Sequence, residues 1–345
     1  MKMRWMILLI LLGIIMTACS PEPAALTVMV HDSFAISAEV MADFENENNV
    51  KVNFLLSGDA GSMLIKAVLT KSAPVADVLY GVDNTFLSRA LAEGIFEVYD
   101  SPLLEQIPDQ YELDAGHRAL PVDFGDVCIN YDKHYFTDKG LAIPASLEDL
   151  TNSEYEGLLV VENPATSSPG LAFLLATIAE YGPDDYLAYW RRLKENGLVV
   201  VNDWNTAYYT NFSGSSGKGS QPMVVSYGTS PAAEVFISDP KVDEAPTASL
   251  VGKNMCFRQI EFVGILKGSK NQALAEKFVD FMLSGSFQED IPLNMFVFPA
   301  NETAKVPAEF TEFVQIPEQP AVVSADQITA NREQWIEAWR AVILQ

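Results

Sequence analysis

The chain has 345 residues and a formal net charge of −24, with 22 Lys and Arg against 46 Asp and Glu. Hydrophobic residues make up 49% of the sequence, which supports large buried cores and excludes an intrinsically disordered chain. The acidic balance argues against nucleic acid as a partner, because phosphate contacts need a basic stripe, and it fits a cationic ligand better.

The first element along the chain is a charged segment followed by an apolar one. Lys2 and Arg4 precede an apolar run over residues 5–16, which is too short to stay across a bilayer and is typical of a secretory signal. The run ends at Met16-Thr-Ala-Cys19, which resembles a bacterial lipobox, where the cysteine is lipidated. We therefore predict export and a lipid anchor at Cys19, in the periplasm or at the outer cell surface. An ordinary cleaved signal with an incidental cysteine is the alternative.

Strand-like and helix-like segments then alternate. Three apolar strand patterns are each followed by a helical pattern, and these strands are 26–30, 50–56 and 76–80. This order predicts a mostly parallel sheet flanked by helices, an α/β fold. Ligands of such sheets bind at the carboxyl ends of the strands. The loops expected there are 31–34, 58–62 and 81–84.

The pattern changes at a long extended run over residues 120–131, which predicts a strand that crosses from one lobe to another. A second strand–helix unit follows, with a strand at 157–161 and a helix at 171–179. Residues 257–266 then resemble a strand that returns to the first lobe. Two crossings imply a domain inserted within a domain, hence two lobes and an interlobe cleft. The predicted divisions are a signal peptide at 1–18, a tether at 19–25, lobe 1 at 26–122 with 252–322, lobe 2 at 123–251, and a C-terminal helix at 323–345.

Polar side chains collect at the predicted strand ends and helix starts. Hydroxyl residues at helix starts suit anions or carboxylates, although helix capping is the simpler explanation of any single one; they are Ser33, Ser62, Ser167 and Ser168. Carboxylates in the same regions can bind a cation or accept hydrogen bonds from an amine; they are Asp32, Asp59, Asp83 and Asp123. The first three of these carboxylates can instead cap helices or shape turns.

Aromatic residues form a further group in the loops. Flat rings near carboxylates suit a flat cationic ring, through stacking and a cation–π attraction of roughly 0.5–2 kcal/mol per pair. Ordinary core packing is the favoured explanation for Tyr209 and Phe298. The group consists of Trp204, Tyr208, Tyr209, Tyr227, Phe296 and Phe298.

Several segments recur in the order of one known family. The most specific are Asn163-Pro-Ala-Thr-Ser-Ser-Pro-Gly-Leu171 and Ser226-Tyr-Gly-Thr-Ser-Pro231, supported by Pro121-Val-Asp-Phe-Gly125 and Arg332-Glu-Gln-Trp-Ile-Glu-Ala-Trp339. Nearly the whole mature chain resembles the thiamine-binding proteins of bacterial ABC importers. The resemblance implies a two-lobed periplasmic-binding-protein-like fold of type II. It also implies a monomer, not an enzyme, that binds thiamine or its mono- or diphosphate and delivers it to an ABC permease with its ATPase.

The resemblance also assigns roles to single positions. Asp59, Ala60 and Ser167 match residues near the phosphate end of the ligand, and Trp204 and Tyr227 match residues around its rings. The predicted ligand-binding set is Asp32, Ser33, Asp59, Ala60, Ser62, Asp83, Asp123, Ser167, Trp204, Tyr208, Tyr227 and Phe296. No catalytic residue, metal or cofactor is expected.

The sequence departs from the family pattern at a few positions. Phe296 falls where the family has a stacking Trp, His31 stands where a Tyr is usual, and Ala233 replaces a further Tyr. No Trp occurs between Phe34 and Phe44, where the family places one. These departures imply a roomier or less aromatic pocket.

Two other functions are compatible with parts of the sequence. A ferric-ion-binding protein of the same fold can use paired phenolates, and Tyr208-Tyr209 with His31 offers hard ligands of that kind. A secreted hydrolase would need a triad, but adjacent His31, Asp32 and Ser33 cannot adopt its geometry. No Gly-x-Ser-x-Gly motif occurs either.

Two cysteines lie outside the lipobox, Cys128 and Cys256. They can pair in an oxidising compartment or remain as two buried free thiols, and their spacing is not a metal motif. The predicted crossings also place Asp126, Asn130 and Gly228 near a hinge between the lobes.

Overall fold

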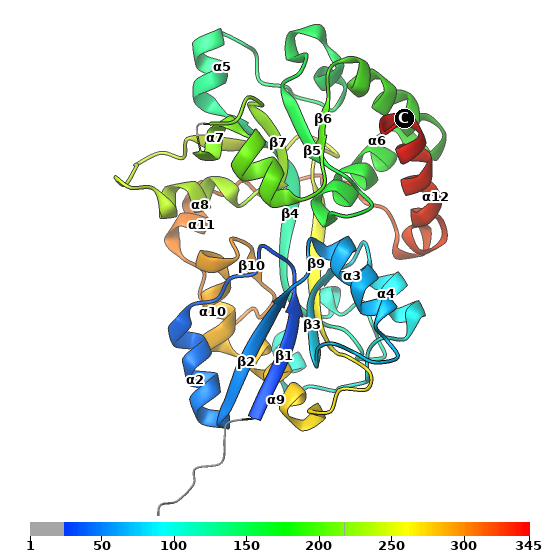
Figure 1. Cartoon of the computed structure of the whole chain (residues 1–345). Coiled ribbons are helices and arrows are strands. Elements are labelled where there is room, and N and C mark those ends of the chain that lie inside the picture. Colours follow the sequence, from blue (N-terminus) through cyan, green and yellow to red (C-terminus); the bar gives the residue numbers. More distant parts are fainter. Residues whose placement is uncertain (1–23, 217) are drawn as a thin grey trace, which may run out of the picture.

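A computed structural model describes residues 24–216 and 218–345. The predicted signal peptide and Cys19 lie outside these residues. Figure 1 shows two lobes, one above the other, joined by β4 (Leu120–Asp132) and β9 (Phe257–Ile265). The two-lobed α/β fold expected from the sequence is therefore confirmed.

One sheet runs through both lobes in the order β2-β1-β3-β9-β4-β7-β5-β6, with β8 and β10 paired to β4. Neighbouring strands are parallel in the outer part of each lobe, β2-β1-β3 below and β7-β5-β6 above. The crossing strands β4 and β9 pair antiparallel with their neighbours and with each other. The remaining strands are β1 (Ala24–Val30), β2 (Val50–Leu56), β3 (Val78–Asp83), β5 (Leu159–Glu162), β6 (Val199–Val201), β7 (Met223–Tyr227), β8 (Thr247–Leu250) and β10 (Phe298–Pro299).

The end of β3 differs from the sequence-based expectation. Residues 81–84 were expected to be a loop, but Gly81 to Asp83 continue the strand, and Val82 and Asp83 pair with β9. The register shifts between Tyr80 and Val82, and Gly81 adopts a φ of 103° at this bulge. A glycine tolerates that backbone conformation, so the strand continues and Asp83 is carried into the interior.

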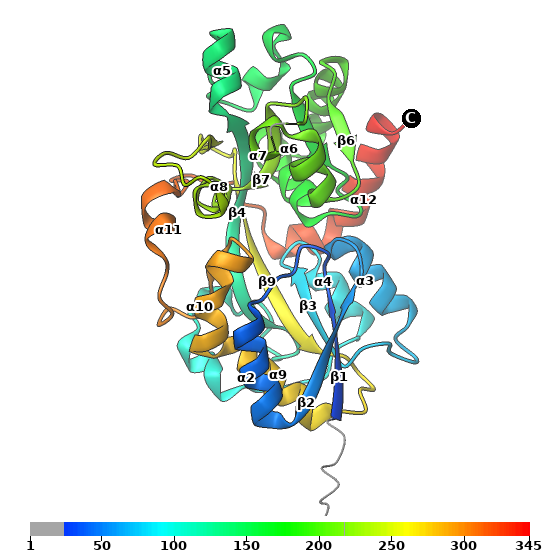
Figure 2. The ribbon, with the colours of Figure 1, turned by 60° about the vertical axis from the view of Figure 1, so that its left-hand side comes forward.

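Helices cover both faces of each part of the sheet. In the lower lobe, α2, α9 and α10 lie on one side and α3 and α4 on the other (Figure 2). The helices are α2 (Ala38–Asn48), α3 (Ala60–Leu69), α4 (Leu87–Glu93), α5 (Lys133–Lys139), α6 (Ser168–Glu195), α7 (Ser213–Ser216), α8 (Ser230–Ile237), α9 (Gln272–Leu283), α10 (Gly285–Asn294), α11 (Ala308–Phe313) and α12 (Ala325–Ile343). Shorter turns are η1 (Pro102–Gln106), η2 (Asp109–Tyr111), η3 (Glu148–Thr151), η4 (Ser153–Tyr155) and the π-helical η5 (Thr206–Asn211).

Local sequence explains where several helices begin and break. The Ser37 side chain accepts a hydrogen bond from Val40 N at the start of α2. Ser324 and Gln327 form a capping box that starts α12. Helix α6 continues beyond the predicted residue 179, with a break at Gly182, where φ is 81° ahead of a proline. Among the described residues, every helix is too short or too polar to cross a membrane.

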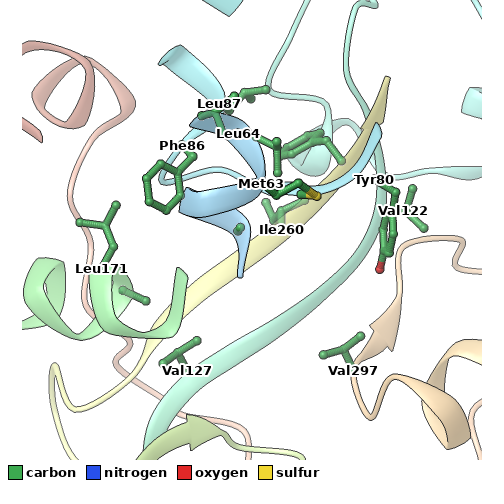
Figure 3. Packing of buried hydrophobic residues seen from close by; sticks show 14 of the residues in the cluster. Met63, Leu64, Tyr80, Phe86, Leu87, Val122, Val127, Leu171, Ile260 and Val297 are labelled. Carbon is green, nitrogen blue, oxygen red and sulfur yellow. The ribbon is translucent and has the colours of Figure 1, made fainter. Parts of the chain in front are cut away.

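The hydrophobic core continues from one lobe into the other. Figure 3 shows Met63 and Leu64 of α3 and Ile260 of β9 in the lower lobe, with Leu171 of α6 nearby. Helix α12 contacts both α6 and α4, so it packs against both lobes. Its Trp339 meets Trp190 of α6 edge to face, with ring centroids 5.5 Å apart. The C-terminal helix therefore links the two lobes by packing against both.

The crossing strands carry covalent and ionic links. Cys128 of β4 forms a disulfide with Cys256, the residue just before β9, so the alternative of two free thiols is wrong. Asp126 of β4 accepts two hydrogen bonds from the Arg258 guanidinium of β9, at 3.0 and 2.7 Å. The two strands that join the lobes are thus tied to each other at the crossing.

Candidate ligand-binding site

A cavity of about 380 Å³ opens between the lobes. Its lower wall comes from the segment after β1, the start of α3, β9 and the end of α10. Its upper wall comes from η5, the end of β7 and α8. The lining residues are His31, Asp32, Ser33, Phe34, Ala35, Asp59, Glu261, Asn294, Met295, Phe296 and Val297 below, and Pro169, Trp204, Asn205, Tyr208, Tyr209, Tyr227, Ser230, Ala233, Glu234 and Ile237 above.

The upper wall presents a group of aromatic rings built around Trp204. The Trp204 ring stacks on Tyr208, with centroids 5.0 Å apart and planes 15° from parallel. Tyr209 meets the same indole edge to face at 5.4 Å. The Trp204 Nε1 donates a 2.9 Å hydrogen bond to Ser226 Oγ, which fixes the orientation of the ring. This wall therefore presents flat, oriented rings to a ligand.

A buried carboxyl group lies against these rings. The Tyr208 hydroxyl donates a 2.7 Å hydrogen bond to Glu234 of α8, whose side chain is almost fully buried. Burial raises the pKa of Glu234 to about 7, although the Tyr208 hydrogen bond opposes that rise. Sequence reasoning missed Glu234. The available signal was its position four residues after Ser230, on the same helical face as the Ser226–Pro231 motif.

The lower wall contains a polar network that begins at His31. His31 Nε2 lies 3.6 Å from a Glu261 carboxylate oxygen, and both side chains are buried. Burial lowers the pKa of His31, but the negative charges of Glu261, Asp59 and Asp32 reverse that effect and raise it. Behind this pair, the Tyr80 hydroxyl donates to Asp123, and its oxygen also lies 3.1 Å from a Glu261 carboxyl oxygen. Burial and the nearby Glu261 raise the pKa of Asp123 well above its usual range.

Asp59 connects the two walls. One of its oxygens accepts from Ala60 N at 3.0 Å and caps α3, and the other accepts from Trp204 N at 3.3 Å. Burial raises the pKa of this carboxyl. Gly61 N also donates to Thr166 O at 3.1 Å. The lobes are therefore in direct contact beside the cavity.

Phe296 forms a second contact between the lobes. Its carbonyl accepts a hydrogen bond from the Thr229 hydroxyl of the upper lobe, and its backbone has a φ of 57°. A phenylalanine rarely adopts this left-handed conformation, and strained residues of this kind cluster at ligand sites. The half-buried ring lines the cavity.

Seven of the twelve predicted ligand-binding residues line the cavity: Asp32, Ser33, Asp59, Trp204, Tyr208, Tyr227 and Phe296. Five do not: Ala60, Ser62, Asp83, Asp123 and Ser167. Ala60 and Ser62 lie inside the first turn of α3, because Asp59 rather than Ser62 starts the helix. Asp123 is buried behind the cavity, hydrogen-bonded to Tyr80.

Asp83 shapes a turn, which was the alternative explanation of this residue in the sequence. Its carboxylate accepts from Thr85 N at 2.8 Å and Phe86 N at 3.2 Å, which shapes the turn before α4, and it also accepts from the Gln259 side chain. Burial raises the pKa of Asp83 to about 6. Phe298, expected in the core, stacks on Phe124 with centroids 5.4 Å apart. Tyr209, expected in the core, instead lines the cavity and is 44% exposed.

The geometry of the site also bears on the two alternative functions, ferric-ion binding and hydrolysis. Tyr208 and Tyr209 both line the cavity, but their rings are 85° apart and the Tyr208 hydroxyl is bonded to Glu234. Burial raises the pKa of Tyr208 well above its usual value, which disfavours the phenolate that ferric iron prefers. In the described part of the chain, no group of three or more His, Cys, Asp or Glu is arranged to hold a metal ion. A hydrolase of the triad type would need a serine hydroxyl bonded to a histidine. Here His31 pairs with Glu261 instead, and the Ser33 hydroxyl lies 3.4 Å from Asn205 Oδ1.

The charges around the cavity have one predominant sign. Four carboxyl side chains line it, and of the residues that the structure describes there, none is Lys or Arg. His31 is the one imidazole in this described lining, and it faces Glu261. Flat rings with nearby carboxylates form a site for a flat cation, through stacking and cation–π attraction.

Comparison with known proteins places this geometry in context. Residues 73–331 match the family of bacterial extracellular solute-binding proteins. The thiamine-binding periplasmic protein of Brucella suis is 30% identical over 322 residues, covering 92% of this chain and 91% of that protein. The protein of the same name from Escherichia coli K12 is 30% identical over 324 residues, covering 92% and 93%. A solved structure of a periplasmic thiamin binding protein superposes with a TM-score of 0.80 at 28% identity, covering 92% of this chain and 96% of that one.

Proposed function

Because the chain belongs to the family of bacterial extracellular solute-binding proteins, we propose that it captures thiamine in its interlobe cavity and releases it unaltered to an ABC importer. The observation that carries this proposal is the stacked Trp204–Tyr208 pair beside the buried carboxyl of Glu234. Thiamine joins a permanently positive thiazolium ring to an aminopyrimidine, and both rings are flat. The names of relatives that match nearly the whole chain support the same ligand.

The cavity offers a role for each part of the ligand. The upper-wall rings would stack on the thiazolium, at roughly 0.5–2 kcal/mol per cation–π contact. Asp32 and Glu234 are the carboxylates proposed to accept from the amino group, because Asp83, the other sequence-based candidate, lies outside the cavity. Binding and release need no covalent step, so we propose that the protein is not an enzyme.

Membership of an extracellular family means that the protein is exported. We further propose that it is lipid-anchored through Cys19 and acts as a monomer beside a membrane permease and its cytoplasmic ATPase. A Cys19→Ala variant, expressed in a host that processes lipoproteins, should then appear in the soluble extracytoplasmic fraction. Retention in the membrane fraction would contradict the anchor.

The lobe boundaries also remain a proposal. We place lobe 1 at 26–122 with 252–322 and lobe 2 at 123–251, so that the crossing strands β4 and β9 lie at the boundaries. The C-terminal helix at 323–345 contacts both lobes through α12. Hydrogen exchange with and without ligand should show protection at both boundaries, if closure bends the chain there.

Calorimetry of the purified protein with thiamine tests the main proposal. We expect one site per chain and complete recovery of unchanged thiamine after unfolding. If neither thiamine nor its monophosphate nor its diphosphate gives a heat of binding, the proposal is refuted. The ferric alternative predicts a visible charge-transfer band when Fe³⁺ is added, and that band together with no thiamine binding would replace our proposal by iron binding.

A further inference from the structure

We propose that Gly125 of β4 is a positioning residue for the ligand, because its lack of a side chain leaves the space in which the Tyr227 ring lies against β4 and clear of the ligand. This inference rests on the proposed function and extends it to a residue outside the cavity lining. It concerns the place where the two walls meet on a crossing strand. Tyr227 belongs to the upper wall and Val297 to the lower wall.

A side chain at position 125 would have almost no space. A Cβ atom at Gly125 would lie 2.9 Å from Tyr227 Cδ1 and 3.4 Å from Tyr227 Cε1. It would also lie 3.2 Å from Val297 Cγ1. Carbon atoms pack best at about 3.5–4.0 Å, so at least one of these two side chains would have to move. Gly125 is therefore a point at which both walls touch the same strand.

The backbone conformation does not itself require a glycine at this position. Gly125 pairs with Gln259 of β9, beyond the register shift of this ladder, and its φ lies outside the left-handed region. A glycine inside a strand lowers stability and often marks a site where another group approaches closely. The close approach of Tyr227 and Val297 is therefore the reason that the structure offers for this glycine.

The backbone around Tyr227 is fixed to β4. Asn130 Nδ2 donates a 3.0 Å hydrogen bond to Tyr227 O, and Gly228 N donates a 2.7 Å hydrogen bond to Asp126 O. The Tyr227 ring, in contrast, is only half-buried and lines the cavity. A methyl group at position 125 would therefore displace the ring rather than the strand end, and the ring would move into the space of the ligand.

The lower-wall neighbour can yield less than the ring. Val297 is buried in the hydrophobic core, and the next residue, Phe298, pairs with Phe124 of β4. Tyr227 also meets Trp204 edge to face, with ring centroids 6.4 Å apart. Displacement of the Tyr227 ring would therefore change the aromatic wall as well as the space in front of it.

Calorimetry with thiamine on the wild type, Gly125→Ala and Gly285→Ala tests the inference. We expect Gly125→Ala to bind thiamine at least about tenfold more weakly, an effect typical of a methyl group added to a packed site. The melting temperature without ligand should stay within about 4 °C of the wild type, because alanine suits a strand better than glycine and the ring can move into the cavity. Gly285→Ala is the matched control and should keep the wild-type affinity, because a Cβ atom at Gly285, the first residue of α10, meets no atom within 4 Å.

A double variant separates a steric wedge from a general disturbance of β4. Adding Val297→Ala to Gly125→Ala removes the Cγ atoms on the other side of the new methyl group. The strand can then shift toward that side, and the Tyr227 ring can return. The double variant should bind thiamine at least about threefold more tightly than Gly125→Ala, whereas Val297→Ala alone should not strengthen binding.

Several outcomes would overturn the inference. They are a thiamine affinity of Gly125→Ala within about twofold of the wild type, an equal loss in Gly285→Ala, and no rescue in the double variant. A melting temperature of Gly125→Ala lowered by more than about 4 °C would show that the glycine serves folding instead, and would also overturn it. Each of these outcomes leaves thiamine binding by the wild type intact. If the wild type binds neither thiamine nor its phosphate esters, the proposed function fails and this inference fails with it.

Discussion

The two walls of the cavity differ in what they supply. The upper wall brings oriented rings, with Trp204 stacked on Tyr208 and one carboxyl group behind them. The lower wall brings three of the four lining carboxyl groups and the His31–Glu261 pair. In our proposal, the upper wall recognises the shape of a flat ring, and the lower wall recognises the sign of its charge. Only contact between the lobes presents both properties to one ligand.

The largest expected loss of thiamine affinity comes from a change in the upper wall. Trp204→Ala removes the central stacking face, so thiamine should bind about 30-fold more weakly, equivalent to about 2 kcal/mol. Trp204→Phe keeps a ring and should lose less. Calorimetry measures both affinities, and the melting temperature checks the fold. Thiamine affinity in Trp204→Ala equal to that of the wild type would show that the aromatic wall does not hold the ligand.

The next effect concerns the one carboxyl group of the upper wall. With a pKa of about 7, Glu234 is mostly neutral at pH 6 and mostly charged at pH 8, so thiamine affinity should rise with pH across this range. Glu234→Gln should bind thiamine roughly tenfold more weakly at pH 8. It should also lose much of the pH dependence. Calorimetry of both proteins at pH 6, 7 and 8 tests this, and parallel pH profiles would rule out Glu234 as the titrating group.

A smaller loss is expected from the ring on the lower wall. Phe296→Ala removes one aromatic contact, which should weaken thiamine binding about fivefold. Phe296→Tyr retains the ring and serves as the matched control. Binding titrations followed by tryptophan fluorescence give both constants. If the alanine variant loses more affinity than Trp204→Ala, the division of roles between the walls is wrong.

The smallest effect is on the stability of the unliganded protein. Asp83 and Glu234 have pKa values raised to about 6 and about 7, so between about pH 4 and pH 7 the folded protein binds more protons than the unfolded chain. Stability should therefore fall as the pH rises, and a His31 with a raised pKa acts in the same direction. The melting temperature should be roughly 5 °C higher at pH 5 than at pH 8. Asp83→Asn should reduce this difference, and a melting temperature that increases with pH would contradict it.

Much of the fold could be predicted because its signals are local. The apolar runs at β1, β2 and β4 and the glycine after α4 mark their own elements. The length of α6 could not be predicted in this way, because its continuation after Gly182 depends on packing against α12. The end of β3 was missed because its pairing partner, β9, lies about 180 residues further along the chain.

The site residues that could be predicted are also those with a local sequence signal. Trp204, Tyr208 and Tyr227 belong to short motifs, and all three line the cavity. Glu261 was missed because a carboxylate inside an apolar strand has no local signal for the face it will occupy, and Glu234 was missed because its one signal was its spacing from Ser230. Asp123 lies in the right strand but is buried behind the cavity, where its partner Tyr80 comes from β3. The register of β4 against β9 shifts between Pro121 and Asp123, and side-chain direction at such a shift depends on pairing between distant strands.

The disulfide between Cys128 and Cys256 has a consequence for the unfolding and proteolysis of the protein. The bond closes a covalent ring that contains most of the upper wall, including Trp204 and Glu234, while the lower wall lies outside it. A ring spanning 128 residues limits the freedom of the unfolded chain, by about 5 kcal/mol on the chain-entropy estimate. A single protease cut within the ring would leave the fragments covalently joined until a reductant is added. The fragments that carry the upper wall therefore stay covalently joined after a single proteolytic cut within the ring.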